Sequence, residues 1–176
     1  MAQRFRIPVT ETGTCSSLGI IGNLEAIADI QRLKYRYFRS LDLKDWDTFG
    51  DCLAADVVTR YGTHAMGEPV HYEGRDAVVD FMRTNLDNGI ITTHIASHPE
   101  IDLDSDTTAH GSWVFEDTVI VPGHAMIRGS GYYADTYRKD EDGVWRIVST
   151  GYQRIYEALT SLEDMPSFKL LANRWA

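Results

Sequence analysis

The chain has 176 residues, of which 43% are hydrophobic, and its 26 acidic residues against 17 basic ones give a formal net charge of -9. This length fits one domain with a substantial buried core. The acidic balance argues against nucleic acid and anionic membrane surfaces as partners, because both are bound by a positive field. No stretch approaches the roughly 18 apolar residues of a membrane span, so we expect no membrane partner.

The N-terminal segment, residues 1–22, is polar and contains Pro8 and three glycines. We expect it to form an arm, which could pack on a neighbouring subunit. It lacks the apolar core of a secretory signal, and the two cysteines, Cys15 and Cys52, do not make a disulfide framework. These features predict reduced thiols and a cytoplasmic protein.

An amphipathic helix is predicted after the arm, because apolar residues recur at steps of three and four from Leu24 to Leu41 and Asn23 can cap its start. Asp42 follows directly. It lies on the flank of the apolar stripe and at the negative end of the helix dipole, where burial and dipole both oppose a carboxylate. Such a side chain needs a partner from elsewhere in the chain.

Two shorter helices and a strand are predicted next. Asp45 can cap a short helix that closes near Asp56, and the β-branched residues at 57–61 indicate a strand, followed by a loop over 62–69. A third helix opens at residues 74–76 and stops at the Asn-Gly pair at 88–89. The first half of the chain is therefore mainly helical.

The second half has the composition of a sheet. Four segments are rich in β-branched and aromatic residues, at 90–97, 107–121, 128–138 and 144–156. Acidic turns at 104–106 and 140–143 separate them, which predicts a meander. Helices followed by a meander indicate an α+β fold, with helices on one face of a curved antiparallel sheet. We expect one domain over residues 23–157 and a mixed tail over 158–176.

Asp117 stands on the apolar face of a predicted strand. In an alternating strand it shares that face with Trp113 and Phe115, while its neighbour Glu116 points to the wetter side. A buried carboxylate needs partners or takes up a proton. Asp117 is therefore a salt-bridged core residue, a strand-end residue or a functional one, and a bulge in the strand would reverse its direction.

His94 and His98 share one face of another predicted strand. A pair of histidines at this spacing is a weak metal motif, because the helical spacing of zinc enzymes does not apply to a strand. We expect no metal. His94 alone reads most simply as a core histidine, but a carboxylate from Asp42 or Asp117 on one ring nitrogen would make it a competent general base.

Arg154 shares a strand face with Tyr152, so it requires a carboxylate or a ligand oxygen unless it lies exposed at a strand end. The run Gly129-Ser130-Gly131 is not a dinucleotide fingerprint, because the third glycine and the strand-to-helix context are missing. No cofactor is therefore predicted.

Four motifs in combination carry a resemblance to a known family. They are YFRSLD with KDWD at 37–47, HxxxHxEI at 94–101, WxxED at 113–117 and GYxRIYE at 151–157. The combination resembles the SnoaL-like branch of the nuclear-transport-factor-two-like superfamily, and within it the bile-acid 7α-dehydratases most of all, with the scytalone dehydratases more distant. The likeness covers residues 24–157 and leaves out both ends.

The resemblance implies a cone, in which a curved antiparallel sheet and three N-terminal helices surround a deep pocket. It also implies a homo-oligomer, with a trimer favoured over a dimer. The family's catalytic residues fall on five positions of this sequence: Tyr37, Asp42, His94, Asp117 and Arg154. The chain between Asp42 and His94 is slightly longer than in the bile-acid enzymes and the loop after Asp117 slightly shorter, so the substrate need not be the same.

The predicted function is a cofactor-independent lyase that removes water from a hydrophobic cyclic or polycyclic hydroxy-carbonyl compound, steroid-like or aromatic. Asp42 would hold His94, which would remove a carbon-bound proton. Seven residues are predicted to bind the substrate: Tyr61, Phe81, His98, Trp113, Phe115, Tyr133 and Tyr152.

Three alternatives stay open. The same site would serve a double-bond isomerase, or a lyase that releases formaldehyde from an aryl-propane diol. A non-catalytic member of the fold, such as a ligand-binding protein or a structural subunit like the β subunit of ring-hydroxylating dioxygenases, would have no need of the five polar residues together.

Overall fold

A computed structural model describes residues 17–67, 69–87 and 89–175. The predicted arm over residues 1–22 falls largely outside this part, and so does Cys15. Residues 17–22 are the exception, because they already belong to the first helix. The first helix therefore begins six residues before Asn23, its predicted cap.

In the part of the chain that the structure describes, three α-helices and a 3-10 turn precede the long strands. They are α1 (Ser17–Leu43), α2 (Trp46–Asp51), η1 (His64–Met66) and α3 (Arg75–Leu86). Asp45 caps α2 as predicted, since its side chain accepts a hydrogen bond from the Thr48 backbone N–H at 3.2 Å. Cys52 follows this helix and is fully buried.

Within the described residues, six strands form one sheet. They are β1 (Leu53–Tyr61), β2 (Val70–Glu73), β3 (Ile91–Leu103), β4 (Thr108–Val121), β5 (Ala125–Lys139) and β6 (Trp145–Ser161). The four predicted segments of the meander are confirmed as β3 to β6. β3, β5 and β6 are longer than expected, and β4 begins one residue later than expected. β2 was not predicted, because its four residues are too few to show a period.

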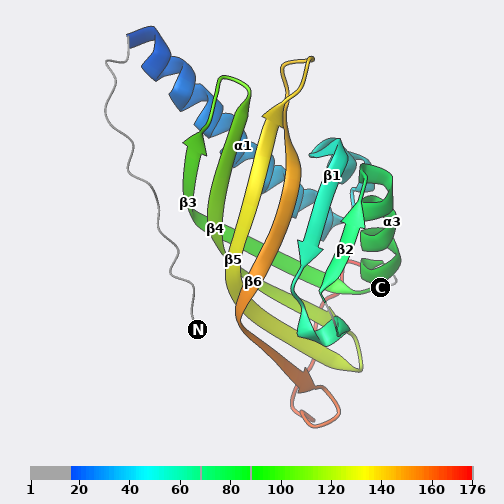
Figure 1. The fold of residues 1–176 in the computed structure, drawn as a ribbon. Coiled ribbons are helices and arrows are strands. Elements are labelled where there is room, and N and C mark those ends of the chain that lie inside the picture. Colours follow the sequence, from blue (N-terminus) through cyan, green and yellow to red (C-terminus); the bar gives the residue numbers. More distant parts are fainter. Residues whose placement is uncertain (1–16, 68, 88, 176) are drawn as a thin grey trace.

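The strand order is β2-β1-β6-β5-β4-β3. The predicted α+β fold class is confirmed, with one difference: β1 pairs with β6 in parallel, so the sheet is mixed. β6 reaches β1 only after the whole meander, and it then runs in the same direction as β1 (Figure 1). All other pairings are antiparallel.

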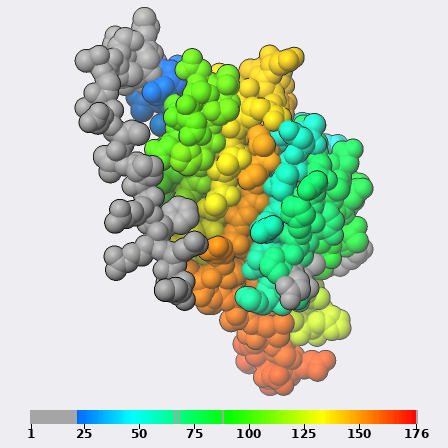
Figure 2. All heavy atoms as spheres, viewed as in Figure 1, coloured from blue at the N-terminus to red at the C-terminus, as the bar shows by residue number. Residues whose placement is uncertain are grey.

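The helices cover the inner face of the curved sheet. Figure 1 shows α1 crossing behind the long strands and α3 lying beside β1 and β2. The core between them contains Tyr37 and Phe38 from α1, Val78 from α3 and Trp113 from β4, all at most 4% exposed. The outer face of the sheet lies open in the space-filling view, and the end of β6 projects beyond the body (Figure 2).

A bulge in edge strand β3 reverses the side-chain direction within that strand. The pairing with β4 is regular up to Ser97, shifts, and resumes at Glu100, and His98 adopts a positive φ of 48° between them. Side chains of even number point inward before the bulge, as at Thr92 and His94, and side chains of odd number do so after it, as at Ile101. Pro99 within the bulge suits an edge strand, which has no pairing partner on that side.

Candidate active site

Asp42 and His94 are in direct contact, although they are 52 residues apart in the sequence. Asp42 Oδ1 lies 2.7 Å from His94 Nδ1. The same oxygen accepts the Thr92 hydroxyl at 2.8 Å, and Oδ2 accepts the backbone N–H of His94 at 2.8 Å. Three hydrogen bonds therefore stabilise the carboxylate that burial and the helix dipole oppose.

The end of α1 positions Asp42. The helix stops in a turn in which Lys44 has a positive φ of 59° and the Asp45 backbone N–H donates to Ser40 O at 2.9 Å. This geometry matches a Schellman-type ending. Asp42 lies in the last turn and faces β3, where the Lys44 ammonium also reaches the Thr92 hydroxyl at 3.1 Å.

A cavity of about 260 Å³ opens beside His94. Its walls are mostly apolar and include Leu41, Phe81, Leu86, Val119, Val121 and Ile127. Since Nδ1 of His94 is bound to Asp42, Nε2 is the nitrogen available to a ligand. Phe38 stacks against the imidazole at 5.3 Å with an interplanar angle of 6°, which fixes the plane of the ring.

A larger and more open hollow, of about 530 Å³, lies on the outer face of the sheet. It lacks the His94 and Arg154 side chains, whereas the smaller cavity is lined by both. We therefore place the candidate active site in the smaller cavity.

Two tyrosines present a pair of hydroxyls to the cavity. Tyr37 Oη and Tyr61 Oη lie 3.1 Å apart, and each can donate to the other. Burial raises the pKa of Tyr37 well above its ordinary value, and the neighbouring Tyr61 and Tyr133 add to this. Burial also raises the pKa of Tyr152, to about 12, against the lowering effect of Arg154. These phenols are therefore neutral donors at physiological pH.

Asp117 and Arg154 form a bidentate ion pair on the cavity wall. Nη1 and Nη2 of Arg154 donate to the two carboxylate oxygens at 2.7 and 2.8 Å, and both side chains are 7% exposed. Burial lowers the pKa of Arg154, but the hydrogen bonds and charge of Asp117, together with the smaller effects of Tyr152 and Glu157, raise it above the ordinary value. Asp117 therefore points inward, as its predicted strand face requires, and it is salt-bridged.

The structure brings most of the predicted site residues to one cavity. Its lining includes eight of the twelve: Tyr37, Tyr61, Phe81, His94, Asp117, Tyr133, Tyr152 and Arg154. Asp42 lies behind His94 and acts on it. His98, Trp113 and Phe115 are not part of the lining.

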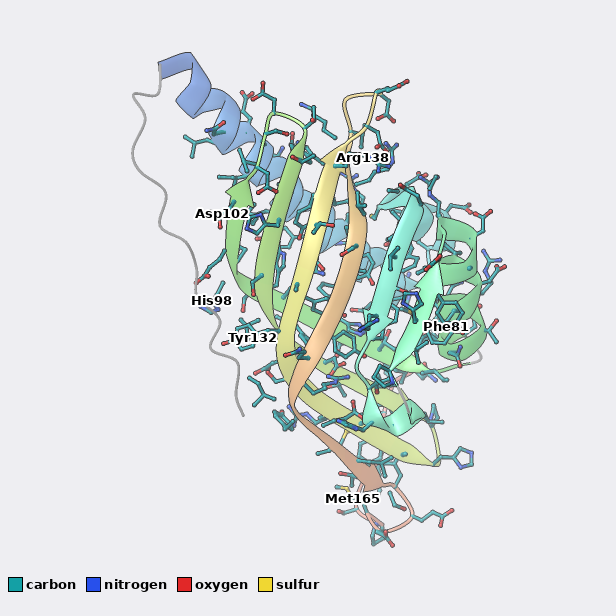
Figure 3. The ribbon with its side chains drawn as sticks, viewed as in Figure 1. Phe81, His98, Asp102, Tyr132, Arg138 and Met165 are labelled. Carbon is teal, nitrogen blue, oxygen red and sulfur yellow. The ribbon has the colours of Figure 1, made fainter. Side chains whose placement is uncertain are left out.

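The three remaining residues are elsewhere for separate reasons. The β3 bulge turns His98 outward, so it does not share a face with His94, and Figure 3 shows it at the sheet edge opposite Phe81. Trp113 is fully buried and donates to Tyr137 Oη at 2.8 Å. Phe115 lies behind the wall, with its ring 4.7 Å from that of Tyr133. Direct substrate contact by these three is not supported.

Lys34 and Asp135 form a buried ion pair that was not predicted from the sequence. Lys34 Nζ donates to Asp135 Oδ2 at 2.7 Å, and both side chains are fully buried. Asp135 also accepts the hydroxyls of Tyr137 at 2.8 Å and Thr150 at 2.7 Å. Burial lowers the pKa of Lys34, and Asp135 opposes this shift.

This ion pair supports the aromatic wall of the cavity. Lys34 Nζ lies 3.7 Å from the ring centroid of Tyr133, 4.9 Å from that of Phe38 and 5.1 Å from that of Tyr37. Tyr37 and Tyr133 line the cavity, and Phe38 stacks on His94. A signal existed in the sequence, because Lys34 interrupts the apolar stripe of the first helix.

No group of three or more His, Cys, Asp or Glu side chains in the described part of the chain could hold a metal ion. Of the helices that the structure describes, none is long and apolar enough to cross a membrane.

A curved sheet whose inner face is covered by helices, with a cavity between them, is the architecture of the cone-shaped α+β domains. The model of the SnoaL-like domain matches residues 22–151. The chain therefore belongs to the SnoaL-like family.

Solved structures with the same fold are distant in sequence. The "putative scytalone dehydratase" of Novosphingobium aromaticivorans DSM 12444 is 19% identical, with a TM-score of 0.67 over 88% of this chain and 95% of that one. Hexachlorocyclohexane dehydrochlorinase LinA-type3 of Novosphingobium barchaimii LL02 is 16% identical, with a TM-score of 0.68 over 80% and 94%. At these identities the likeness shows the fold.

Proposed function

We propose that this protein is a cofactor-independent lyase, a dehydratase that removes water from a hydrophobic cyclic compound carrying a hydroxyl and a carbonyl group. The observation that carries the proposal is the 2.7 Å contact between Asp42 and His94 at the wall of an apolar cavity. The names of two structural neighbours, a dehydratase and a dehydrochlorinase, describe eliminations and agree with this chemistry.

In the proposed reaction, Nε2 of His94 removes a proton from the carbon next to the substrate carbonyl. Asp42 holds the ring in the required tautomer and stabilises the imidazolium. The carbonyl becomes an enolate, which the Tyr37 and Tyr61 hydroxyls can stabilise by hydrogen bonds. The enolate then expels the hydroxyl, which takes a proton from the imidazolium or from Tyr37 and leaves as water, while a carbon–carbon double bond forms. The elimination breaks one C–H and one C–O bond and forms one carbon–carbon π bond with no net oxidation or reduction. A proton given by Tyr37 is replaced from the imidazolium, so no cofactor is needed.

In this proposal Arg154 does not stabilise the enolate. Both of its terminal nitrogens donate to Asp117, so we assign the enolate to the tyrosine hydroxyls. The Asp117–Arg154 pair then serves as a rigid polar wall that orients the substrate.

The size of the cavity bears on the substrate. Pockets for drug-sized ligands range from about 300 to 1,000 Å³, and this one, at about 260 Å³, lies just below that range. A substrate of one or two rings fits the volume better than a four-ring steroid, so we propose an aromatic or bicyclic hydroxy-ketone.

The test is incubation with a panel of cyclic hydroxy-ketones of one to four rings, followed by mass analysis of the products. We expect loss of water from a one- or two-ring member, and loss of this activity in His94→Ala. A product of unchanged mass would show an isomerase, and loss of formaldehyde would show the other lyase. Turnover at the wild-type rate in His94→Ala would refute the proposed base.

The predicted homo-oligomer and cytoplasmic location stay predictions. Ile95, Tyr132 and Ile155 are 63%, 53% and 65% exposed on the outer face of the sheet, which would suit contact with a second copy. Light scattering with size-exclusion chromatography would distinguish the favoured trimer from a dimer or a monomer.

A further inference from the structure

Four residues on neighbouring strands form one row across the inner face of the sheet. The Cα pairing runs from His94 on β3 to Asp117 on β4, to Gly129 on β5 and to Glu157 on β6. Three members carry ionisable side chains and the fourth has none. Because neighbouring strands lie about 4.8 Å apart, Gly129 leaves a gap two strand spacings wide between two carboxylates.

Arg154 fills this gap. A Cβ at position 129 would collide with Arg154 Nη1 and come within 3.0 Å of Asp117 Oδ1, so glycine makes room for the guanidinium. On one side Arg154 donates twice to Asp117. On the other side its Nε lies 3.0 Å from Glu157 Oε2, and the Glu157 side chain is 6% exposed. One cation is thus held between two shielded carboxylates.

Glu157 also holds a segment of the cavity wall. Its Oε1 accepts the Ala65 backbone N–H at 2.6 Å, and its Oε2 accepts the Thr63 hydroxyl at 2.9 Å. Thr63 and Ala65 both line the cavity. One carboxylate therefore connects the wall segment to the arginine.

We propose that Glu157 is a positioning residue and that the clamp formed by Asp117, Arg154 and Glu157 restricts the cavity to uncharged ligands. The clamp carries one positive and two negative charges, a net charge of -1. The arginine charge is already neutralised, so a ligand carboxylate would meet the excess negative charge in a site of low dielectric. This inference rests on the proposed function only in placing the ligand in the same cavity.

The experiment compares two aromatic probes of equal shape, 2-naphthamide and 2-naphthoate, by calorimetry at pH 7.5. We expect the wild-type protein to bind the neutral amide at least about ten-fold more tightly than the anion. Glu157→Gln removes one negative charge but keeps an oxygen that can accept the Ala65 N–H. In this variant the preference should fall by about ten-fold.

The matched control is Glu116→Gln. Glu116 adjoins Asp117 but is exposed on the outer face of the sheet, so the same change in net charge there should leave the preference unaltered. A variant whose structure is merely loosened would bind both probes more weakly, and the ratio of the two affinities would stay unchanged.

Several results would overturn the proposal. They are equal or tighter binding of naphthoate to the wild-type protein, an unchanged ratio in Glu157→Gln, an equal change in Glu116→Gln, and no binding of naphthamide at millimolar concentration. If the protein shows the expected preference for naphthamide but never eliminates water, the proposal about the clamp stands and the proposed lyase activity is refuted. The two ideas therefore fail separately.

Discussion

Replacing Asp42 with asparagine should convert Nε2 of His94, the ring nitrogen that faces the cavity, from a hydrogen-bond acceptor to a donor. The carboxylate accepts three hydrogen bonds, from the His94 backbone N–H, the His94 ring and the Thr92 hydroxyl. An asparagine keeps one acceptor oxygen. The backbone N–H can only donate, so it retains that oxygen, and the amide NH2 must occupy the place of Oδ1 and face Nδ1 of the ring.

The consequence follows from the two tautomers of imidazole. Nδ1 becomes an acceptor, the ring proton moves to Nε2, and the nitrogen at the cavity ceases to be a base. General base catalysis contributes about 10²–10⁴-fold, so turnover should fall by that factor. The Thr92 hydroxyl can accept from the new amide, and the loss of folding stability should stay near 1 kcal/mol, as for a typical hydrogen bond.

Long-range ¹H–¹⁵N correlation spectra of the imidazole at pH 9 report the tautomer without any substrate. We expect a proton on Nδ1 in the wild-type protein and on Nε2 in Asp42→Asn. Thr92→Val is the control, because it removes one hydrogen bond and leaves the carboxylate, so Nδ1 should stay protonated. The reasoning is refuted if the wild-type ring carries its proton on Nε2, or if the asparagine variant keeps the wild-type tautomer.

Three further predictions concern a buried ion pair, the buried phenols and a buried thiol. Lys34→Met leaves the Asp135 carboxylate buried without a cation, which costs about 3–5 kcal/mol and lowers the melting temperature by roughly 6–20 °C. Changing Asp135 to Leu as well should recover much of this loss in calorimetry, and no recovery would contradict the buried charge as the cause.

Burial raises the pKa of five phenols, those of Tyr37, Tyr61, Tyr133, Tyr137 and Tyr152. Their contribution to stability is complete below about pH 10, where unfolded tyrosine is neutral, and it is lost as the pH rises, at ~1.4 kcal/mol per pH unit for each phenol. The free energy of unfolding in urea should be much lower at pH 11 than at pH 9. Equal urea midpoints at the two pH values would contradict this prediction. Burial also raises the pKa of Cys52 to about 12. In a Cys15→Ser background its alkylation at pH 8 should be no faster than unfolding, which mass spectrometry can time.

The periodic patterns of the sequence predicted the fold class and the direction of most site residues. Alternation placed Asp117 on the inner face of its strand, and the stripe of the first helix placed Asp42 on its flank. His98 shows where this reasoning stops, because one extra residue in β3 reversed the face that alternation assigned to it. Trp113 shows a second limit: its face was right, but alternation does not say which inward residues reach the cavity and which lie beneath the wall.

By itself, the sequence determined the local properties of this protein: where helices and strands form, which faces are apolar, and which polar residues stand on those faces. Such properties depend on neighbours a few residues apart. Only the tertiary structure decided the partners. It paired Asp42 with His94, which no local pattern indicated and only the family resemblance had implied. It also paired Lys34 with Asp135, and Arg154 with two carboxylates across a glycine. These contacts join residues far apart in the chain, and strand register, bulges and helix placement set them, since a shift of one residue in any strand would exchange the buried and exposed sets.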